Sequence, residues 1–191
     1  MNVGYAGVAV LSRVEPRRVQ YGFGDPNLDD EARLLTVEYS DFVLVNLYVP
    51  YSGSRKRTAW DSRLFSHLDN LSSPNKPLIV CGDFNVSLSD LDVADRELRP
   101  GTAGLTAAER FCMGRLLGLH LVDSFRILHS ESVNEFSFWR YGGDYRGGNF
   151  GWRLDYFLIS PELCSLLINA DILSTVLGSD HCPVTLTVKI F

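Results

Sequence analysis

Short runs rich in β-branched and aromatic residues recur along the chain, and each is bounded by Gly, Pro, Asp or Ser. Runs of this length and composition predict β-strands. Two of them are joined by a tight polar connection at residues 38–41, so we expect a hairpin there. The predicted strands span residues 7–13, 34–38, 42–49, 78–81, 136–141, 154–159 and 184–190.

Helical periodicity occurs between these runs. In residues 59–71 the apolar side chains recur at three- and four-residue spacing, which predicts one buried helical face. Thr106 followed by Glu109 is the capping-box pattern, and it predicts the start of a second helix. A third, short helix is expected over residues 161–168.

The order of these elements indicates the fold class. Hairpin-spaced strands that alternate with two or three helices fit a layered α/β sandwich better than a doubly wound sheet. The chain has 191 residues, which is enough for one domain with a substantial core and too few to favour two. We therefore expect a single domain over residues 1–191.

The composition limits the classes of partner. The formal net charge is −5, so nucleic-acid binding would have to rest on local basic clusters, at residues 55–57 and at Arg140, Arg146 and Arg153. The first cluster is equally well explained as a solvated loop. No apolar run approaches the ~20 residues that span a bilayer, and the four cysteines show no paired spacing. An intracellular protein without a membrane partner is predicted.

Polar clusters follow several predicted strands, at positions where a side chain is held rigidly at the rim of a sheet. In Asp83-Phe84-Asn85, period-two alternation puts both polar side chains on one face. Taken alone, this motif is better explained as a turn, because Asp and Asn bond readily to their own backbone.

Asp180-His181 is a stronger signal. A lone histidine is more often a core or surface group than a catalyst, but His181 follows a carboxylate and precedes a predicted strand. Asp155 is available to bond its other ring nitrogen and fix the tautomer. The joint occurrence of these motifs indicates a catalytic site.

The chain contains, in this order, GYAGVAVLSR, LYVPYSG, CGDFNV, DSFR, FSFWRY, GWRLDYFLIS and LGSDHCPVTL. Together they closely resemble the exonuclease III type of apurinic/apyrimidinic (AP) endonuclease in the endonuclease/exonuclease/phosphatase superfamily, and its eukaryotic branch in particular. The resemblance implies a four-layer α/β sandwich of two packed mixed β-sheets flanked by helices. It also implies Mg²⁺-dependent incision of duplex DNA 5′ to abasic sites, with room for 3′-exonuclease or 3′-phosphodiesterase activity.

The resemblance assigns roles to five polar residues. Asp83 would activate or orient the attacking water, and Asn85 would hydrogen-bond the nucleophile and the phosphate. His181, oriented by Asp155, would contact the scissile phosphate. Tyr48 would donate a hydrogen bond to a phosphate oxygen.

The resemblance also implies two kinds of DNA contact. Phe138, Trp152 and Leu154 would form the pocket for the extruded abasic sugar, although core packing explains them equally well without the family match. Contacts with the DNA backbone are implied for Arg33, Arg153, Thr102 and Gly104.

The expected metal site departs from the family pattern. Asp180, with Asp83, would hold Mg²⁺, for which Mn²⁺ is the alternative. The family's main metal-binding glutamate follows a glutamine at a strand end, whereas the only glutamine here, Gln20, precedes Tyr21. The fold is expected to lack its first strands, and a partner chain or a further amino-terminal segment would complete the sheet.

Two functions from different classes stay open. The complete polar cluster favours a DNA-repair phosphodiesterase, with the nucleus as the expected compartment and the mitochondrion as the alternative. The missing glutamate favours a catalytically weak or silent family member that acts as a structural subunit of a larger assembly.

Overall fold

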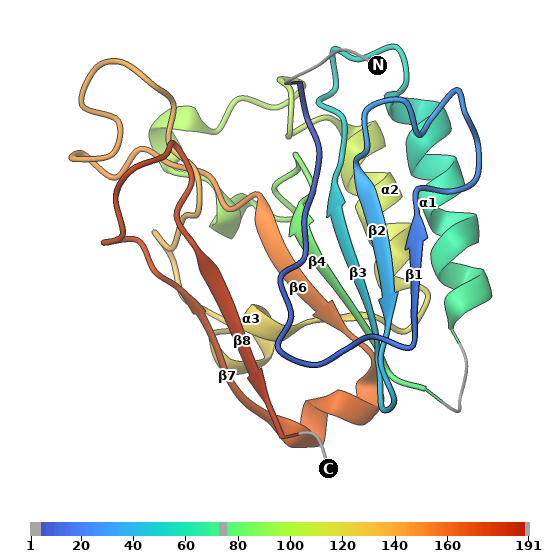
Figure 1. The fold of residues 1–191 in the computed structure, drawn as a ribbon. Helices are drawn as coiled ribbons and strands as arrows, with labels where there is room; N and C mark the ends of the chain where they lie inside the picture. The colour runs from blue at the N-terminus through green and yellow to red at the C-terminus, as the bar shows by residue number, and fades with distance from the viewer. Residues whose placement is uncertain (1–4, 73–75, 190–191) are drawn as a thin grey trace.

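A computed structural model describes residues 5–72 and 76–189 (Figure 1). Its main sheet has six strands in the order β1-β2-β3-β4-β6-β5, and β7 and β8 form a separate two-stranded sheet. The strands are β1 (Arg18–Tyr21), β2 (Leu34–Glu38), β3 (Val43–Tyr48), β4 (Leu78–Asp83), β5 (Val122–Asp123), β6 (Asp155–Ile159), β7 (Leu167–Ile172) and β8 (Val184–Val188). The helices are α1 (Arg57–Leu71), α2 (Ala107–Leu117), α3 (Ser124–Leu128) and the short 3-10 helices η1 (Asp90–Asp92), η2 (Asp95–Glu97) and η3 (Pro161–Leu166).

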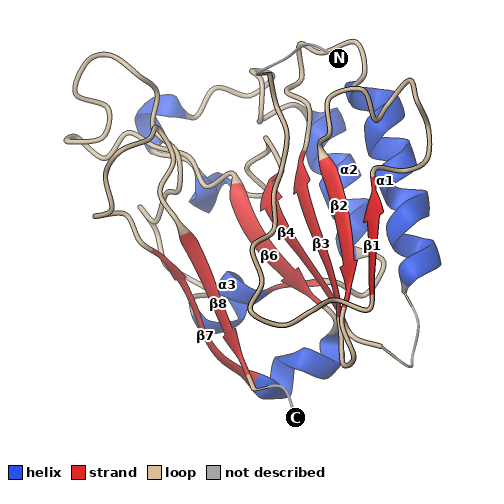
Figure 2. Cartoon of the chain, in the orientation of Figure 1, coloured by secondary structure: helices blue, strands red, loops and turns tan. Residues whose placement is uncertain are grey.

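The layers follow from the alternation of side chains along the strands. In β3, Val43, Val45 and Leu47 are buried and belong to the same core cluster as Trp60 and Leu64 of α1. Helices α1 and α2 lie against this face of the main sheet, and the β7–β8 hairpin lies on its other side (Figure 2). A separate cluster of apolar residues joins the two sheets. It contains Ile79, Ile159, Leu163 and partly buried neighbours that include Leu44 and Leu186.

This architecture confirms the predicted fold class. Pairing is antiparallel throughout the main sheet except between β3 and β4, which are parallel, so the sheet is mixed. The second sheet differs from the expectation, because its two described strands pair only antiparallel. Within the described residues, each helix is too short or too polar to cross a bilayer.

The strongly patterned elements were predicted well. The hairpin at residues 38–41 is confirmed, since β2 and β3 pair antiparallel. Helix α1 covers the predicted helical segment, and α2 begins with the predicted capping box between Thr106 and Glu109. Strand β8 covers the expected strand as far as Val188, and Ile190 lies outside the described residues.

Two predicted strands are wrong. Residues 7–13 cross the main sheet as an extended segment that is held by Val8 N donating to Ala32 O and Asn46 Nδ2 donating to Ala9 O. None of the described strands pairs with this segment, so its apolar pattern is not used in a ladder, and the Leu11 side chain is 96% exposed. Residues 136–141 make isolated bridges in place of a strand, because Phe138 pairs with both Trp152 and His181.

Three further differences lie at the edges of the sheets. Two strands were not predicted: β1, whose mixed polar composition suits an exposed edge, and β7, which begins where the predicted helix over residues 161–168 should continue. Helix η3 ends at Leu166 instead. The two-residue strand β5 was also missed.

Candidate active site

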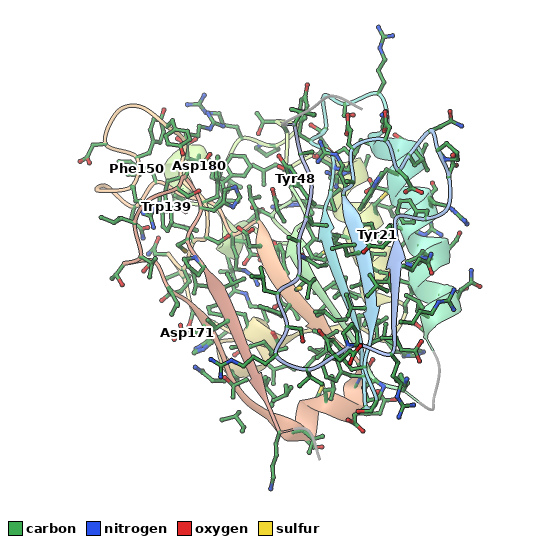
Figure 3. All side chains as sticks on the ribbon, viewed as in Figure 1. Tyr21, Tyr48, Trp139, Phe150, Asp171 and Asp180 are labelled. Carbon is green, nitrogen blue, oxygen red and sulfur yellow. The ribbon has the colours of Figure 1, made fainter. Side chains whose placement is uncertain are left out.

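Adjacent strand ends bring the polar residues together. Tyr48 ends β3 and is paired in register with Asp83 at the end of β4, and Asp83 is paired with Asp155 at the start of β6. Because β3 and β4 are parallel and β6 runs antiparallel to them, Tyr48, Asp83 and Asp155 lie at the same end of the main sheet. Tyr48 and Asp180 are labelled at this end of the molecule in Figure 3.

His181 reaches the same edge from the segment before β8. Its ring packs against Phe138, with the ring centroids 4.9 Å apart, and its Nδ1 lies 2.7 Å from Asp155 Oδ2. This contact was predicted from the sequence. It occupies one ring nitrogen and leaves Nε2 as the atom available to a ligand in the pocket that His181 lines.

Ser137 fixes the Asp155 carboxylate that is hydrogen-bonded to His181. Its side chain is completely buried, and its Oγ donates to Asp155 Oδ2 at 2.7 Å. The same oxygen accepts the backbone N–H groups of Leu154 and Asp155 at 3.0 and 3.1 Å. Sequence reasoning missed Ser137, because its role depends on a contact 18 residues away.

Asp83 is both a turn residue and a pocket residue. Its Oδ1 accepts the N–H of Asn85 at 2.7 Å, which is the local bond expected of a turn, and Asn85 has a φ of 49°. Asn85 Nδ2 donates to Val49 O at 2.8 Å, and both side chains line the pocket. The turn and the converging pair of polar groups are therefore the same structure.

The charged groups of the site shift each other's pKa values. Desolvation and the nearby Asp155 carboxylate raise the pKa of Asp83 to about 7. Burial acts to lower the pKa of His181, but the hydrogen bond with Asp155 and the surrounding carboxylates outweigh it and raise that pKa to about 9. Near neutral pH, His181 is therefore a cation beside a carboxyl group that can exchange a proton.

Asp83 and His181 line a common cavity of about 290 Å³. Phe138, Trp152 and Leu154 form an apolar part of its lining, as predicted for a pocket. Gly104 faces the Trp152 ring, and a Cβ at this position would lie 3.0 Å from Trp152 Cζ3. The cavity is lined by Tyr48, Tyr51, Ser52, Asp83, Asn85, Ala103, Gly104, Phe138, Arg140, Trp152, Leu154, Asp180 and His181.

Helix α2 holds one segment of the cavity lining in place. Glu109 Oε2 accepts the backbone N–H groups of both Gly104 and Thr106, at 3.0 and 3.1 Å. The predicted capping residue therefore also fixes the glycine opposite Trp152. Thr102 lies outside the cavity lining, and its Oγ1 donates to Arg99 O.

Two arginines predicted to contact DNA are internal, and those predictions need correction. Arg153 is 1% exposed, and its guanidinium pairs with Asp92 and Asp123 at 2.8 and 2.6 Å. Arg33 is 3% exposed and donates to Glu31 and to Tyr48 O. The resemblance assigned both roles by position in the sequence, which cannot separate a buried arginine from an exposed one, and here both arginines bind segments that carry site residues.

The comparison with known proteins decides the family. A model of the Endonuclease/Exonuclease/phosphatase family matches residues 1–181. The chain belongs to this family. The resemblance found in the sequence is thereby confirmed.

Relatives within the Endonuclease/Exonuclease/phosphatase family are similar over nearly the whole chain. The DNA repair nuclease APEX1 of Danio rerio is 41% identical over 189 residues, which is 96% of this chain and 60% of that protein. A DNA-(apurinic or apyrimidinic site) endonuclease of Dictyostelium discoideum is 35% identical over 195 residues, which is 98% of this chain and 54% of that protein. This chain therefore spans little more than half the length of these two relatives.

A solved structure agrees with the sequence comparison. The 3′ phosphatase NExo from Neisseria, bound to a product DNA hairpin, superimposes with a TM-score of 0.85 at 27% identity. The match covers 94% of this chain and 73% of that one.

The donor atoms in this family member suit a hard cation, but they are few. Asp83 and Asp180 are the carboxylates in the cavity lining, and Mg²⁺ is commonly held by one or two carboxylates together with water and substrate phosphate oxygens. A cluster of three or more His, Cys, Asp or Glu side chains able to hold a metal is absent from residues 5–72 and 76–189. The donor set therefore fits a cation to which the substrate also contributes ligands.

Proposed function

We propose that this chain is a metal-dependent phosphodiesterase that incises the DNA backbone 5′ to an abasic site and leaves a 3′-hydroxyl. One observation carries the proposal: a single cavity combines Asp83, the Asp155–His181 pair and an apolar wall. The names of the two relatives, a DNA repair nuclease and an AP-site endonuclease, support it.

The residues divide the chemistry of phosphodiester hydrolysis between them. Asp83, which lines the cavity beside Asn85, would orient the attacking water and accept its proton. His181, protonated because its pKa is about 9, would donate from Nε2 to an oxygen of the scissile phosphate, and the Tyr48 hydroxyl would donate to another. A cation held by Asp180 with Asp83, Mg²⁺ or alternatively Mn²⁺, would neutralise charge on the phosphate oxygens.

The apolar wall supports an abasic sugar as the recognised group. Phe138, Trp152 and Leu154 offer no charged partner to a base edge. Gly104 lies so close to the Trp152 ring that even a Cβ would be only 3.0 Å from Trp152 Cζ3. A nucleotide without its base costs little to extrude from a duplex, whereas an intact base must be unstacked and accommodated. The cavity would therefore select the lesion by its shape.

The test is incision of an end-labelled duplex that carries one abasic-site analogue, in Mg²⁺ and in chelator. We expect metal-dependent incision, and we expect Asp83→Asn or His181→Gln to lower kcat by about 100- to 10,000-fold. Asp171→Asn is the matched control, because Asp171 lies on β7, far from Asp180 in Figure 3, and bonds to the backbone N–H of Ile172.

The same assay is run on a version that carries the amino-terminal strands expected from the family. Incision by the extended version alone supports the proposal for the longer protein and shows that the sheet must be completed, by that segment or by a partner chain. If neither version incises the duplex, the chain is a catalytically silent family member, and the proposal is contradicted.

Processing of 3′ ends is a second activity for the same cavity. The superposition on a Neisseria 3′ phosphatase favours it, and release of phosphate from a 3′-phosphorylated strand would measure it. A nuclear or mitochondrial location stays a prediction, which imaging of the tagged protein in cells would decide.

A further inference from the structure

Arg146 binds the loop that leads into Asp180. Its Nη1 donates to Ser179 O at 2.8 Å, and its Nη2 donates to Ser174 O at 3.0 Å and to Val176 O at 2.6 Å. One guanidinium thus gathers three carbonyl groups from the connection between β7 and β8. One of these carbonyl groups belongs to Ser179, the residue immediately before Asp180.

The other bonds of this loop are short-range ones, among them His181 N donating to Ser179 Oγ at 3.2 Å and Ser179 Oγ donating to Asp180 Oδ1 at 3.1 Å. Residues 174–179 are all exposed, so side-chain burial does not hold the loop in place. Its backbone makes two short turns, from Ser174 N to Ile172 O and from Val176 N to Leu173 O. The fork of donors on Arg146 therefore supplies the cross-link between this loop and the rest of the site.

The far end of the loop is held by the segment that also contacts Arg146. Trp139 N donates to Asp180 O at 2.8 Å, and Cys182 N donates to Ser137 O at 2.8 Å. The Arg146 guanidinium lies over the Trp139 ring, 4.4 Å from its centroid. Trp139, Phe150 and Asp180 are labelled in the same part of the molecule in Figure 3.

The loop that carries Arg146 is itself braced. Gly148 N donates to Asp144 O, and Asn149 Oδ1 accepts Trp139 Nε1–H at 3.1 Å. A Cβ at Gly151 would lie 2.6 Å from Trp139 Nε1, so only glycine fits beneath the ring. Arg146 therefore projects from a loop that is hydrogen-bonded to Trp139 through Asn149.

We propose that Arg146 is a positioning residue: it fixes the loop at residues 174–179 so that Asp180 and His181 face the cavity, and it does so without touching the substrate. This inference rests on the proposed function. It gives Arg146 a different role from the DNA phosphate contact that a basic, aromatic-rich loop would suggest. The three carbonyl groups use three of the five N–H donors of the guanidinium, and its Nε is buried without a hydrogen-bond partner in the described structure, so only one Nη1 N–H remains for a phosphate.

The experiment compares Arg146→Gln and Arg146→Lys with Arg115→Gln. Arg115 is the matched control, because its guanidinium also lies over an aromatic ring, that of Phe65, but on α2 outside the cavity lining. For Arg146→Gln we expect kcat on the abasic duplex to fall by about 100-fold, since small displacements of catalytic groups have effects of that size. KM and the salt dependence of binding should stay close to those of the unchanged protein.

Hydrogen exchange of the metal-free protein gives a readout that does not depend on activity. We expect the amides of Trp139 and Cys182 to exchange faster in Arg146→Gln, because their acceptors lie on the segments that Arg146 holds together. The amide of Val80 in the central strand β4 should be unaffected, which would show that the fold is intact. Arg146→Lys keeps the charge but loses the forked set of donors. Its exchange rates at Trp139 and Cys182 should lie between those of the unchanged protein and those of Arg146→Gln.

The outcomes separate the two proposals. If neither the unchanged protein nor its amino-terminally extended version incises DNA, the proposed function fails, and the exchange rates alone judge the role of Arg146. Unchanged exchange at Trp139 and Cys182 would overturn the positioning role. So would a rise in KM with a shallower salt dependence and an unchanged kcat, which is the signature of a direct phosphate contact.

Discussion

Ser137, Asp155 and His181 form a chain of hydrogen bonds that sets the state of the histidine. The buried Ser137 hydroxyl donates to the same Asp155 oxygen that binds His181 Nδ1. A carboxylate held in this way stabilises the imidazolium and fixes the ring orientation. The state of His181 therefore depends on two residues that need not touch the substrate.

The titration of His181 tests this relation in protein freed of divalent cations. We expect a pKa near 9, so the ring is charged at neutral pH and loses its proton only in alkaline solution. Asp155→Asn removes both the charge and the strong acceptor, and the pKa should fall toward the ordinary 6.5. NMR of the ring protons against pH measures it, with Asp171→Asn as the control. An unchanged midpoint in Asp155→Asn would contradict the assigned cause.

At the scale of elements, the parallel pair β3–β4 places the site, and Gly82 allows the two strands to approach. Gly82 has a φ of +129°, and a Cβ there would lie 1.9 Å from Leu47 O. Neither the backbone conformation nor the contact tolerates a side chain. This glycine directly precedes Asp83, so it contributes to the placement of the carboxylate.

Gly82→Ala should lower the free energy of unfolding by about 3 kcal/mol, because strain in the backbone and a clash with a carbonyl add together. The control is Gly114→Ala in α2, where a Cβ meets nothing within 4 Å. That change should stabilise the protein by about 0.5–1 kcal/mol, since alanine is the better helix former. Urea unfolding measures both. Equal effects of the two substitutions would refute the argument.

The elements that could be predicted are those whose pattern is local. Helix α2, with its cap at Thr106, and the β2–β3 hairpin follow from residues close in sequence. The segment at Phe138 could not be predicted, because its conformation is fixed by partners at Trp152 and His181. The same distinction holds for the site, where strand-end motifs revealed Asp83 and His181 but not Ser137.

At the scale of the whole molecule, a buried ionic cluster ties distant segments together beneath the site. Arg153 pairs with Asp92 of η1 and Asp123 of β5, and Arg126 of α3 also pairs with Asp92. Burial acts to raise the pKa of Asp92, but the two guanidinium groups hold it below its usual range. The charge pattern of the sequence could not reveal that Arg153 serves this network.

Arg153→Met should lower the free energy of unfolding by about 3–5 kcal/mol, because it leaves Asp92 and Asp123 buried with too few partners. Lys76→Met, which removes the partly exposed pair with Glu38, should have a much smaller effect. Chemical denaturation compares the two. A loss at Arg153 no larger than that at Lys76 would show that the cluster does not hold these segments.

The cavity is proposed to hydrolyse one particular phosphodiester bond. The most direct measurement is the identity of the ends that the chain, alone or with its sheet completed, produces in Mg²⁺ from a duplex with one abasic site. We expect a single cut 5′ to the abasic residue and a 3′-hydroxyl that a DNA polymerase extends. An intact duplex with both versions, or a cut on the 3′ side, would contradict it.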